Sequence, residues 1–81
     1  KAEAADFEVL GVDNAEVADW VYKNCETDQL ILEFYTPGEP NSGWIHASYV
    51  PFNRRAQYMR AFKEEGKTKY KPITGKAVDL V

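Results

Sequence analysis

Three stretches of the chain alternate between apolar and polar residues, and each is typical of a short β-strand. These are residues 4–10, 29–36 and 44–50. Successive side chains of a strand point to opposite faces, so this alternation gives each predicted strand one apolar face and one more polar face. Residues 37–43 separate the second and third stretches. They contain two prolines and two glycines, which predicts an irregular loop.

Residues 14–25 have apolar positions at helical rather than alternating spacing. Asp13 precedes this segment and Glu16 follows three residues later, which is the spacing of a capping box at a helix N-terminus. The pattern therefore predicts one amphipathic helix between the first two strands. Its inner stripe is predicted to contain Val17, Trp20 and Val21.

The C-terminal third of the chain predicts a β-hairpin. Residues 56–63 and 68–73 have strand-like composition, and Gly66 lies in the short polar segment between them. A short helix over residues 54–62 is a competing interpretation of the same segment. The sequence shows no internal repeat and no domain boundary, so residues 1–81 are treated as a single domain.

Placing the three strands in one sheet sorts their side chains into two distinct faces. One face is apolar and suited to being covered by the helix. The other face brings together Asp6, Glu33 and His46, one from each strand, with Tyr35, Trp44 and Ser48 beside them. The predicted apolar face consists of Phe7, Val9, Leu30, Leu32, Phe34, Ile45, Ala47 and Tyr49.

The polar face has two interpretations. A sheet face opposite a helix is commonly exposed to water, and polar side chains there need no function. Alternatively, the two carboxylates and the imidazole form a metal or catalytic site. Catalytic zinc takes about three protein ligands and a water molecule. Since His46 is the only histidine, such a site would need a further ligand from outside this set.

Composition narrows the possible classes of protein. Apolar residues make up 44 % and charged residues 28 % of the 81 residues, which is typical of a globular domain. No apolar run approaches the roughly 20 residues that span a bilayer, and the first residues do not resemble a signal peptide. Cys25 is the only cysteine, so the chain has no internal disulfide or four-cysteine zinc site.

Charge is distributed unevenly along the chain. The net charge is −3, but residues 1–52 sum to −8 and residues 53–76 sum to +6. The basic segment suits either a solvated hairpin or a surface for an anionic partner. The acidic overall balance and the lack of a nucleic-acid-binding motif argue against nucleic acid as that partner.

Three segments together resemble the D-alanyl-D-alanine carboxypeptidase-like zinc peptidases, a family that includes phage endolysins. The family's metal motif is Ser-x-His-x-x-Gly-x-Ala-x-Asp, and its end matches Glu3-Ala4-Ala5-Asp6. The later strand with the second metal histidine matches residues 44–49, Trp-Ile-His-Ala-Ser-Tyr. The strand between them matches at Leu32-Glu33. The resemblance covers about 50 of the 81 residues.

The resemblance implies the hedgehog/DD-peptidase-like fold, an α+β domain whose antiparallel sheet has a helix on one face and a metal site on the other. It implies that Asp6 and His46 bind Zn²⁺ together with a histidine two residues upstream of Lys1. The chain is therefore expected to be the C-terminal part of a longer peptidase. The motif's glycine corresponds to Ala2, and Gly43 occupies the position where many members have the catalytic acid.

The implied activity is hydrolysis of peptide bonds in bacterial peptidoglycan. With Gly43 at the usual position of the acid, the general base is assigned to Glu33. Trp44 and Tyr35 are expected to line the cleft for the peptidoglycan peptide. No membrane partner is expected, and a phage enzyme of this kind would be made in the host cytoplasm and act on the cell wall.

Two other functions remain open from the sequence. One is a non-catalytic cell-wall-binding or virion structural module on the same fold. The other is an unrelated small domain that binds an anionic partner through residues 54–71. Zinc content distinguishes the peptidase from both of these.

Overall fold

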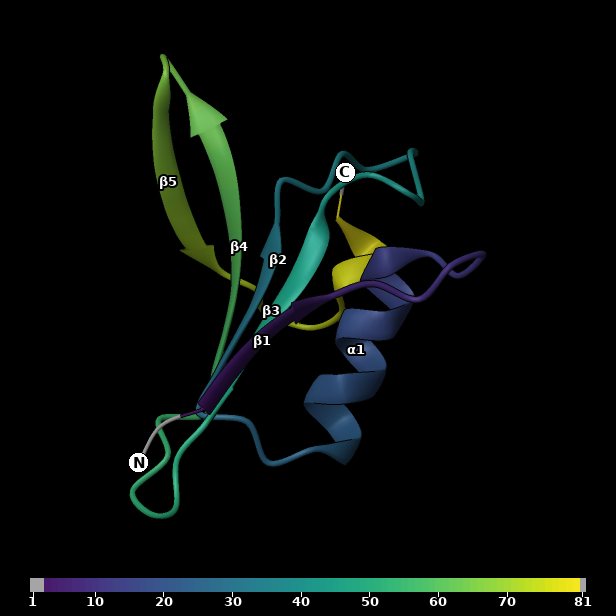
Figure 1. Ribbon diagram of the computed structural model, residues 1–81. Helices are drawn as coiled ribbons and strands as arrows, with labels where there is room; N and C mark the ends of the chain where they lie inside the picture. The colour runs from purple at the N-terminus through teal and green to yellow at the C-terminus, as the bar shows by residue number, and fades with distance from the viewer. Residues whose placement is uncertain (1–2, 81) are drawn as a thin grey trace.

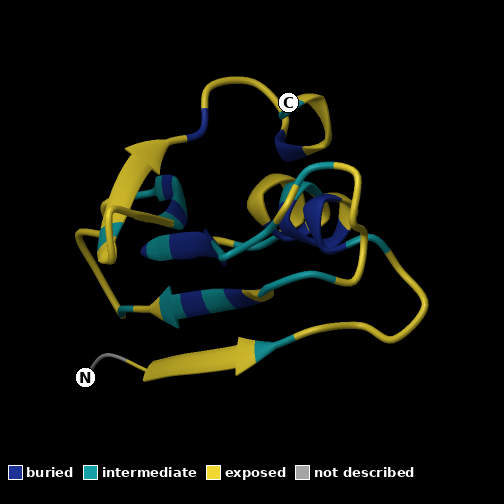
Figure 2. Cartoon of the chain, turned by 90° about the horizontal axis from the view of Figure 1, so that it is seen from above, coloured by how far each residue is buried: buried dark blue, intermediate teal, exposed yellow. Residues whose placement is uncertain are grey.

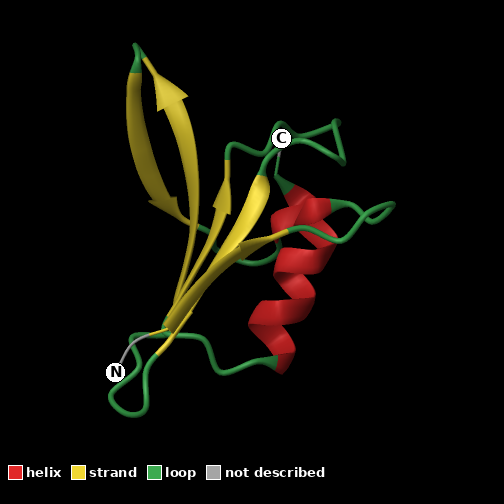
Figure 3. Cartoon of the chain, viewed as in Figure 1, coloured by secondary structure: helices red, strands yellow, loops and turns green. Residues whose placement is uncertain are grey.

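A five-stranded sheet with one helix packed against it forms most of residues 3–80, the part of the chain that this computed structural model describes (Figure 1). This arrangement confirms the α+β class. Figure 3 shows the helix on one side of the sheet only. The elements are β1 (Glu3–Phe7), α1 (Asn14–Asn24), β2 (Gln29–Glu33), β3 (Trp44–Tyr49), β4 (Gln57–Glu64), β5 (Lys67–Pro72) and the short 3₁₀ helix η1 (Ala77–Asp79).

The sheet is mixed rather than purely antiparallel, which corrects the expected arrangement. Its strand order is β1-β3-β2-β4-β5. β3 pairs antiparallel with both β1 and β2, and β4 pairs antiparallel with β5. β2 and β4 are parallel, with Gln29 in register with Gln57. The predicted hairpin is confirmed, and the alternative helix over residues 54–62 is wrong.

The parallel pair exists because the loop after β3 crosses the N-terminal end of β2 and is fixed there. Asp28 makes the anchoring contacts. Its carboxylate accepts hydrogen bonds from the backbone N–H and the guanidinium of Arg55, the shortest at 2.6 Å, and its carbonyl accepts from Gln57 N–H at 3.0 Å. The hydrogen bonds from Arg55 lower the pKa of Asp28 below its usual value of 3.8. β4 therefore starts beside the start of β2 and runs in the same direction.

The core lies between the sheet and α1, and Figure 2 shows buried segments in dark blue on the central strands and on the helix. Leu30, Leu32, Ile45 and Ala47 are buried there, as predicted. Val17 and Val21 are buried on the inner stripe of the helix, as predicted, but Trp20 is 62 % exposed and does not belong to that stripe. The buried helix residues are Asn14, Ala15, Val17, Ala18 and Val21.

Two residues predicted for the apolar face lie outside the core because β1 and β3 end earlier than expected. Val9 follows the end of β1, which stops at Phe7, and is 46 % exposed. Tyr49 is the last residue of β3 and is 41 % exposed. Phe7 itself is partly buried and packs against the core, in agreement with the prediction.

Phe34 interrupts the alternation that predicted a strand to residue 36. Its backbone adopts φ of 55°, in the left-handed region that non-glycine residues seldom occupy. The turn of the chain places the Phe34 ring against Trp44, with ring centroids 5.4 Å apart, and therefore on the face away from α1. The predictions that Phe34 is in the core and that Tyr35 lies on the polar face are both wrong.

Gly43 allows β2 and β3 to approach closely at this point. It has φ of 68°, and a Cβ atom there would lie 2.1 Å from the carbonyl oxygen of Glu33. We expect Gly43→Ala to lower the free energy of unfolding by about 2–4 kcal/mol, from backbone strain and overpacking together. Urea denaturation measures this loss.

Gly38→Ala is the matched control for that substitution. Gly38 also has positive φ, 91°, but a Cβ there would meet no atom within 4 Å. It should therefore lose only the conformational contribution, about 1–2 kcal/mol. Equal losses for the two variants would show that the contact with Glu33 is not responsible.

Candidate functional site

Asp6 and His46 are direct neighbours on the sheet face opposite α1. Their backbones are register partners across the β1–β3 pair. The Asp6 Oδ1 and His46 Nδ1 atoms lie 2.6 Å apart, and both side chains remain accessible, at 62 % and 27 % exposure. The two residues assigned to metal binding from the sequence are therefore brought together.

The contact with Asp6 indicates which ring nitrogen of His46 carries the hydrogen. An ionised carboxylate only accepts hydrogen bonds, so Nδ1–H of His46 donates to Asp6 and Nε2 stays free. A pair of this kind can bind a cation between the two side chains after they separate slightly. It can equally hold the imidazole in one orientation for a ligand at Nε2.

The open face, meaning the sheet face away from α1, consists of parallel rows of side chains across the strands. One row contains Asp6, His46, Ile31 and Met59 in register. Ile31 is only 5 % exposed although it is not part of the core beneath α1. Beyond His46, the row therefore continues with the apolar side chains of Ile31 and Met59. The open face consists of Ala4, Asp6, Gln29, Ile31, Glu33, Trp44, His46, Ser48, Gln57, Met59, Ala61, Lys63, Thr68, Tyr70 and Pro72.

Glu33 belongs to the next row on the same face. Its register partners are Trp44 on β3 and Ala61 on β4. It is thus diagonal to His46 rather than opposite it, at a backbone separation of about 7–8 Å that is usual for diagonal neighbours. The Glu33 carboxylate does not join the Asp6–His46 contact but lies beside it on the same face.

The donor set fits part of a zinc site. A carboxylate oxygen and an imidazole nitrogen are both common zinc ligands, with bonds of about 2.0–2.2 Å. Tetrahedral geometry places two such ligand atoms about 3.3 Å apart, so Asp6 and His46 need to move apart by less than 1 Å. Within residues 3–80, no group of three or more potential ligands forms around them. A third protein ligand would have to come from elsewhere.

The other residues singled out in the sequence have different surroundings. Trp44 lies on the open face and is 37 % exposed, in agreement with the prediction. Tyr35 lies on the helix side, where its hydroxyl donates to Asp13 at 2.9 Å. Burial and this hydrogen bond raise the pKa of Tyr35 to about 12. Ser48 Oγ contacts the Gln29 backbone instead of the Asp6–His46 pair.

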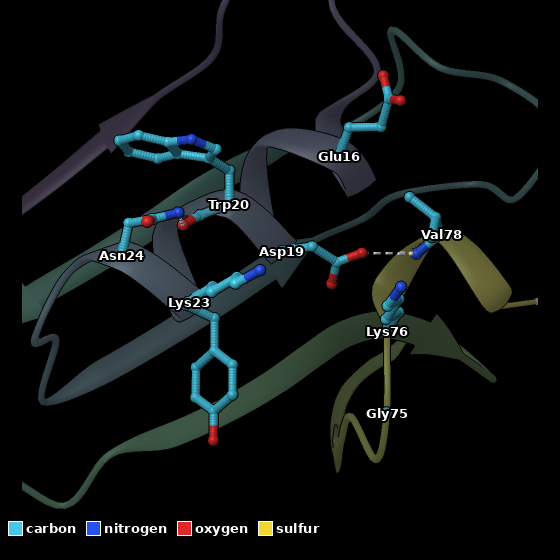
Figure 4. A pocket seen from close by; sticks show the side chains of 9 residues that line it. Glu16, Asp19, Trp20, Lys23, Asn24, Gly75, Lys76 and Val78 are labelled. Atoms are coloured by element: carbon cyan, nitrogen blue, oxygen red, sulfur yellow. Dashed lines mark hydrogen bonds between the residues drawn. The ribbon is translucent and has the colours of Figure 1, made fainter.

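A hollow of about 610 Å³ lies away from the Asp6–His46 pair, along the outer side of α1 (Figure 4). Asp19, its central carboxylate, accepts hydrogen bonds from the backbone N–H groups of Ala77 and Val78 and from the Tyr58 hydroxyl, at 2.6–3.1 Å. These bonds attach the C-terminal segment to the helix. Both carboxylate oxygens of Asp19 take part in these bonds.

Sequence reasoning did not place β4 beside the candidate site. Met59 and Ala61 complete the open face next to Ile31 and Glu33 because β4 pairs with β2. Their alternation with Tyr58 and Arg60 is visible in the sequence, but the strand that they join is not. Only the observed pairing connects the basic hairpin to the face of His46.

Two further observations bear on the class of protein. No helix within residues 3–80 has the length and apolar character required to cross a membrane. Comparison with protein-family models, with curated proteins and with solved structures finds no match to this chain.

Proposed function

We propose that this chain is part of a zinc-dependent peptidase that hydrolyses peptide bonds of bacterial peptidoglycan. The observation that supports the proposal most is the contact between Asp6 and His46, two zinc-type ligands 2.6 Å apart on an accessible sheet face. The same two residues are the metal ligands implied by the resemblance of residues 3–6 and 44–49 to DD-peptidase-like zinc enzymes. The finer fold assignment to that family is part of this proposal.

Asp6 and His46 would hold the metal, with a histidine upstream of Lys1 as the third protein ligand. When bound, zinc supplies Lewis acidity for the scissile carbonyl and lowers the pKa of water to about 7. Asp6 would lose its hydrogen bond to His46 on loading and would balance part of the ion's charge. This role needs an ionised carboxylate and a neutral imidazole, so binding should weaken in acid.

Glu33 would move the proton. In the proposed reaction, its carboxylate takes a proton from the attacking water as oxygen adds to the carbonyl carbon of the peptide. It then returns that proton to the amine that leaves when the C–N bond breaks. The diagonal placement beside His46 supports this role, because the base must lie next to the metal ligands without being one.

Trp44 would position the peptide on the open face. Its indole is partly exposed and stands opposite Glu33 in register. Aromatic side chains commonly form the walls of ligand sites. Tyr35 donates a hydrogen bond from its hydroxyl to Asp13, which keeps the ring on the helix side. Its side chain therefore does not line the open face where Trp44 would position the peptide.

Digestion of purified peptidoglycan tests the proposal. We expect the intact protein to release soluble fragments with new amino groups, because the bonds broken are peptide bonds. A chelator should suppress this release and added zinc should restore it. Release of reducing sugar without new amines, or digestion that a chelator leaves unchanged, would contradict the proposal.

A further inference from the structure

The hairpin of β4 and β5 extends beyond the rest of the sheet, and the helix does not cover it. β4 continues three residues past the register partner of Glu33, to Glu64, and most of β5 is exposed. α1 packs mainly against β2, β3 and η1. Figure 1 shows the hairpin rising away from the helix. Beyond Tyr58, whose ring stacks on Tyr22 of the helix, the α1 side of the hairpin is therefore open to a ligand.

Four cations lie together on this α1 side of the hairpin, and we call them the cation row. They are Arg60 of β4 and Lys67, Lys69 and Lys71 of β5. Alternate residues of a strand are about 6.6–6.8 Å apart, so the three lysines follow one line along β5. The one carboxylate on this side of the two strands is Glu64, opposite Lys67 near the tip. The row is therefore strongly positive away from the tip.

Like charges face one another in the cation row without compensation. Arg60 and Lys71 are register partners, and a pair of equal charges in these positions destabilises a sheet. The ion pairs among residues 3–80 are His46 with Asp6 and Arg55 with Asp28, so no salt bridge neutralises the row. Lysines discourage pairing at an edge strand, which accounts for those of β5, but Arg60 belongs to the inner strand β4. An anion bound between Arg60 and Lys71 would relieve their repulsion.

Phe62 holds two of these cations in place. The Arg60 guanidinium lies 5.1 Å from the centroid of the Phe62 ring, and Lys71 Nζ lies 5.9 Å from it. Cation–π contacts order charged groups and leave their N–H donors free to bind a ligand. Arg60 and Phe62 also line a hollow of about 430 Å³, together with Lys63 and residues 34–37, and this lining contains no carboxylate. The row is thus partly preorganised for an anion.

From these contacts we infer that the α1 side of the hairpin binds a linear phosphodiester polymer whose repeating unit is a small polyol. Phosphates joined by three-carbon units recur at a spacing similar to that of the lysines. Each ammonium group can bind a phosphate oxygen as a point charge. The polymer would lie along β5, with one phosphate between Arg60 and Lys71. This surface is separate from the Asp6–His46 pair, and the inference goes beyond the proposed peptidase activity.

Other anionic partners fit the cation row less well. Single-stranded nucleic acid binds through bases that stack on aromatic rings, but the Phe62 ring is contacted by two cations. A membrane surface needs apolar side chains that protrude beside the charges, and Phe62 is half-buried. An extended acidic peptide would add to the free edge of β5, where the lysines and Pro72 disfavour strand addition. A flexible phosphate polymer requires none of these features.

Binding of a short, fluorescently labelled poly(glycerol phosphate) to the intact protein tests the inference. Fluorescence anisotropy measures the affinity at several salt concentrations. Each phosphate contact of a single-stranded polyanion contributes about −0.7 to the slope of log affinity against log salt, so the four cations predict a slope of about −3. Absence of binding, or a slope near zero, would overturn the inference.

The double substitution Lys69→Gln with Lys71→Gln should lower this affinity by about tenfold. Lys23→Gln with Lys63→Gln is the matched control, because it removes the same charge from the helix and from the opposite side of the hairpin. The control should bind almost as tightly as the unmodified protein. Equal losses in the two double variants would show that only net charge matters and would overturn the inference.

Arg60→Gln separates loss of binding from loss of fold. This variant should bind the polymer more weakly but should unfold at the same or a higher urea concentration, because it removes the repulsion between Arg60 and Lys71. Unchanged affinity in folded Arg60→Gln would contradict the placement of a phosphate between these two residues.

Competition by other polyanions identifies the partner. The competitors are oligodeoxythymidylate, polyglutamate with the same number of charges, and phosphatidylglycerol vesicles. Poly(glycerol phosphate) should bind more tightly than all three. Tighter binding of any competitor would overturn the inference and would assign the cation row to nucleic acid, an acidic protein or a membrane instead. None of these measurements needs zinc or hydrolysis, so their outcome is independent of the proposed peptidase function.

Discussion

Replacing His46 with alanine is expected to abolish zinc retention and to lower peptidoglycan hydrolysis by about a thousandfold or more. His46 is the only histidine of this chain and the nitrogen donor in contact with Asp6. Loss of the metal removes several kcal/mol of transition-state stabilisation, and each 1.4 kcal/mol corresponds to about tenfold in rate. Amine release from peptidoglycan and metal analysis of the purified variant measure the two effects.

Ser48→Ala is a suitable control for His46→Ala. Ser48 lies two residues further along β3 on the same face, and its hydroxyl contacts the Gln29 backbone. The control should retain zinc and activity, whereas His46→Ala loses both. If hydrolysis persists in folded His46→Ala, His46 is not a metal ligand and the proposed mechanism is wrong.

Glu33→Gln should leave the zinc content unchanged and lower the turnover number by about 10²- to 10⁴-fold, the usual contribution of a general base. The substitution preserves the shape of the side chain but removes its ability to accept a proton from water. It also leaves the Asp6–His46 contact intact, since Glu33 belongs to the neighbouring row of the sheet. Zinc analysis and the steady-state rate on a synthetic stem peptide test it together.

Glu39→Gln controls for the removal of one negative charge from the chain. Glu39 is an exposed residue of the loop between β2 and β3. Turnover should be normal in that variant. Normal turnover in Glu33→Gln would show that a different carboxylate acts as the base, and loss of zinc there would show that Glu33 is a ligand instead.

Strand alternation alone predicts that Asp6 and His46 share a face, and the observed register brings them into contact. Each residue lies near the middle of a strand with a clear period of two, and the apolar residues beside them must face the helix. Once β1 and β3 pair, the two polar side chains share a face, and the observed register makes them partners. The zinc ion and its third ligand remain predictions that rest on the resemblance.

The error at Phe34 has a local cause that the sequence does not reveal. Residues 29–36 alternate regularly, but the left-handed backbone of Phe34 ends the strand early. Phe34 and Tyr35 therefore lie on the faces opposite to those predicted. Glycine or asparagine normally indicates such a position, and neither is present there. Gly43 of the neighbouring segment approaches the backbone of residues 33–35 closely at this point.

The parallel pairing of β2 with β4 depends on contacts between residues far apart in sequence. The hairpin itself is local and was predicted correctly, whereas its place in the sheet depends on the Asp28–Arg55 ion pair, formed across 27 positions. For this reason, the sequence indicated a basic hairpin but not the strand beside which it lies.

Zinc content of the intact protein, measured after expression with added zinc and removal of loosely bound metal, tests the central claim most directly. Asp6 and His46 are proposed to hold one shared ion. We predict one zinc per chain in the unmodified protein and far less than one in both Asp6→Asn and His46→Ala. An unmodified protein without zinc, or full zinc content in both variants, would contradict the assignment.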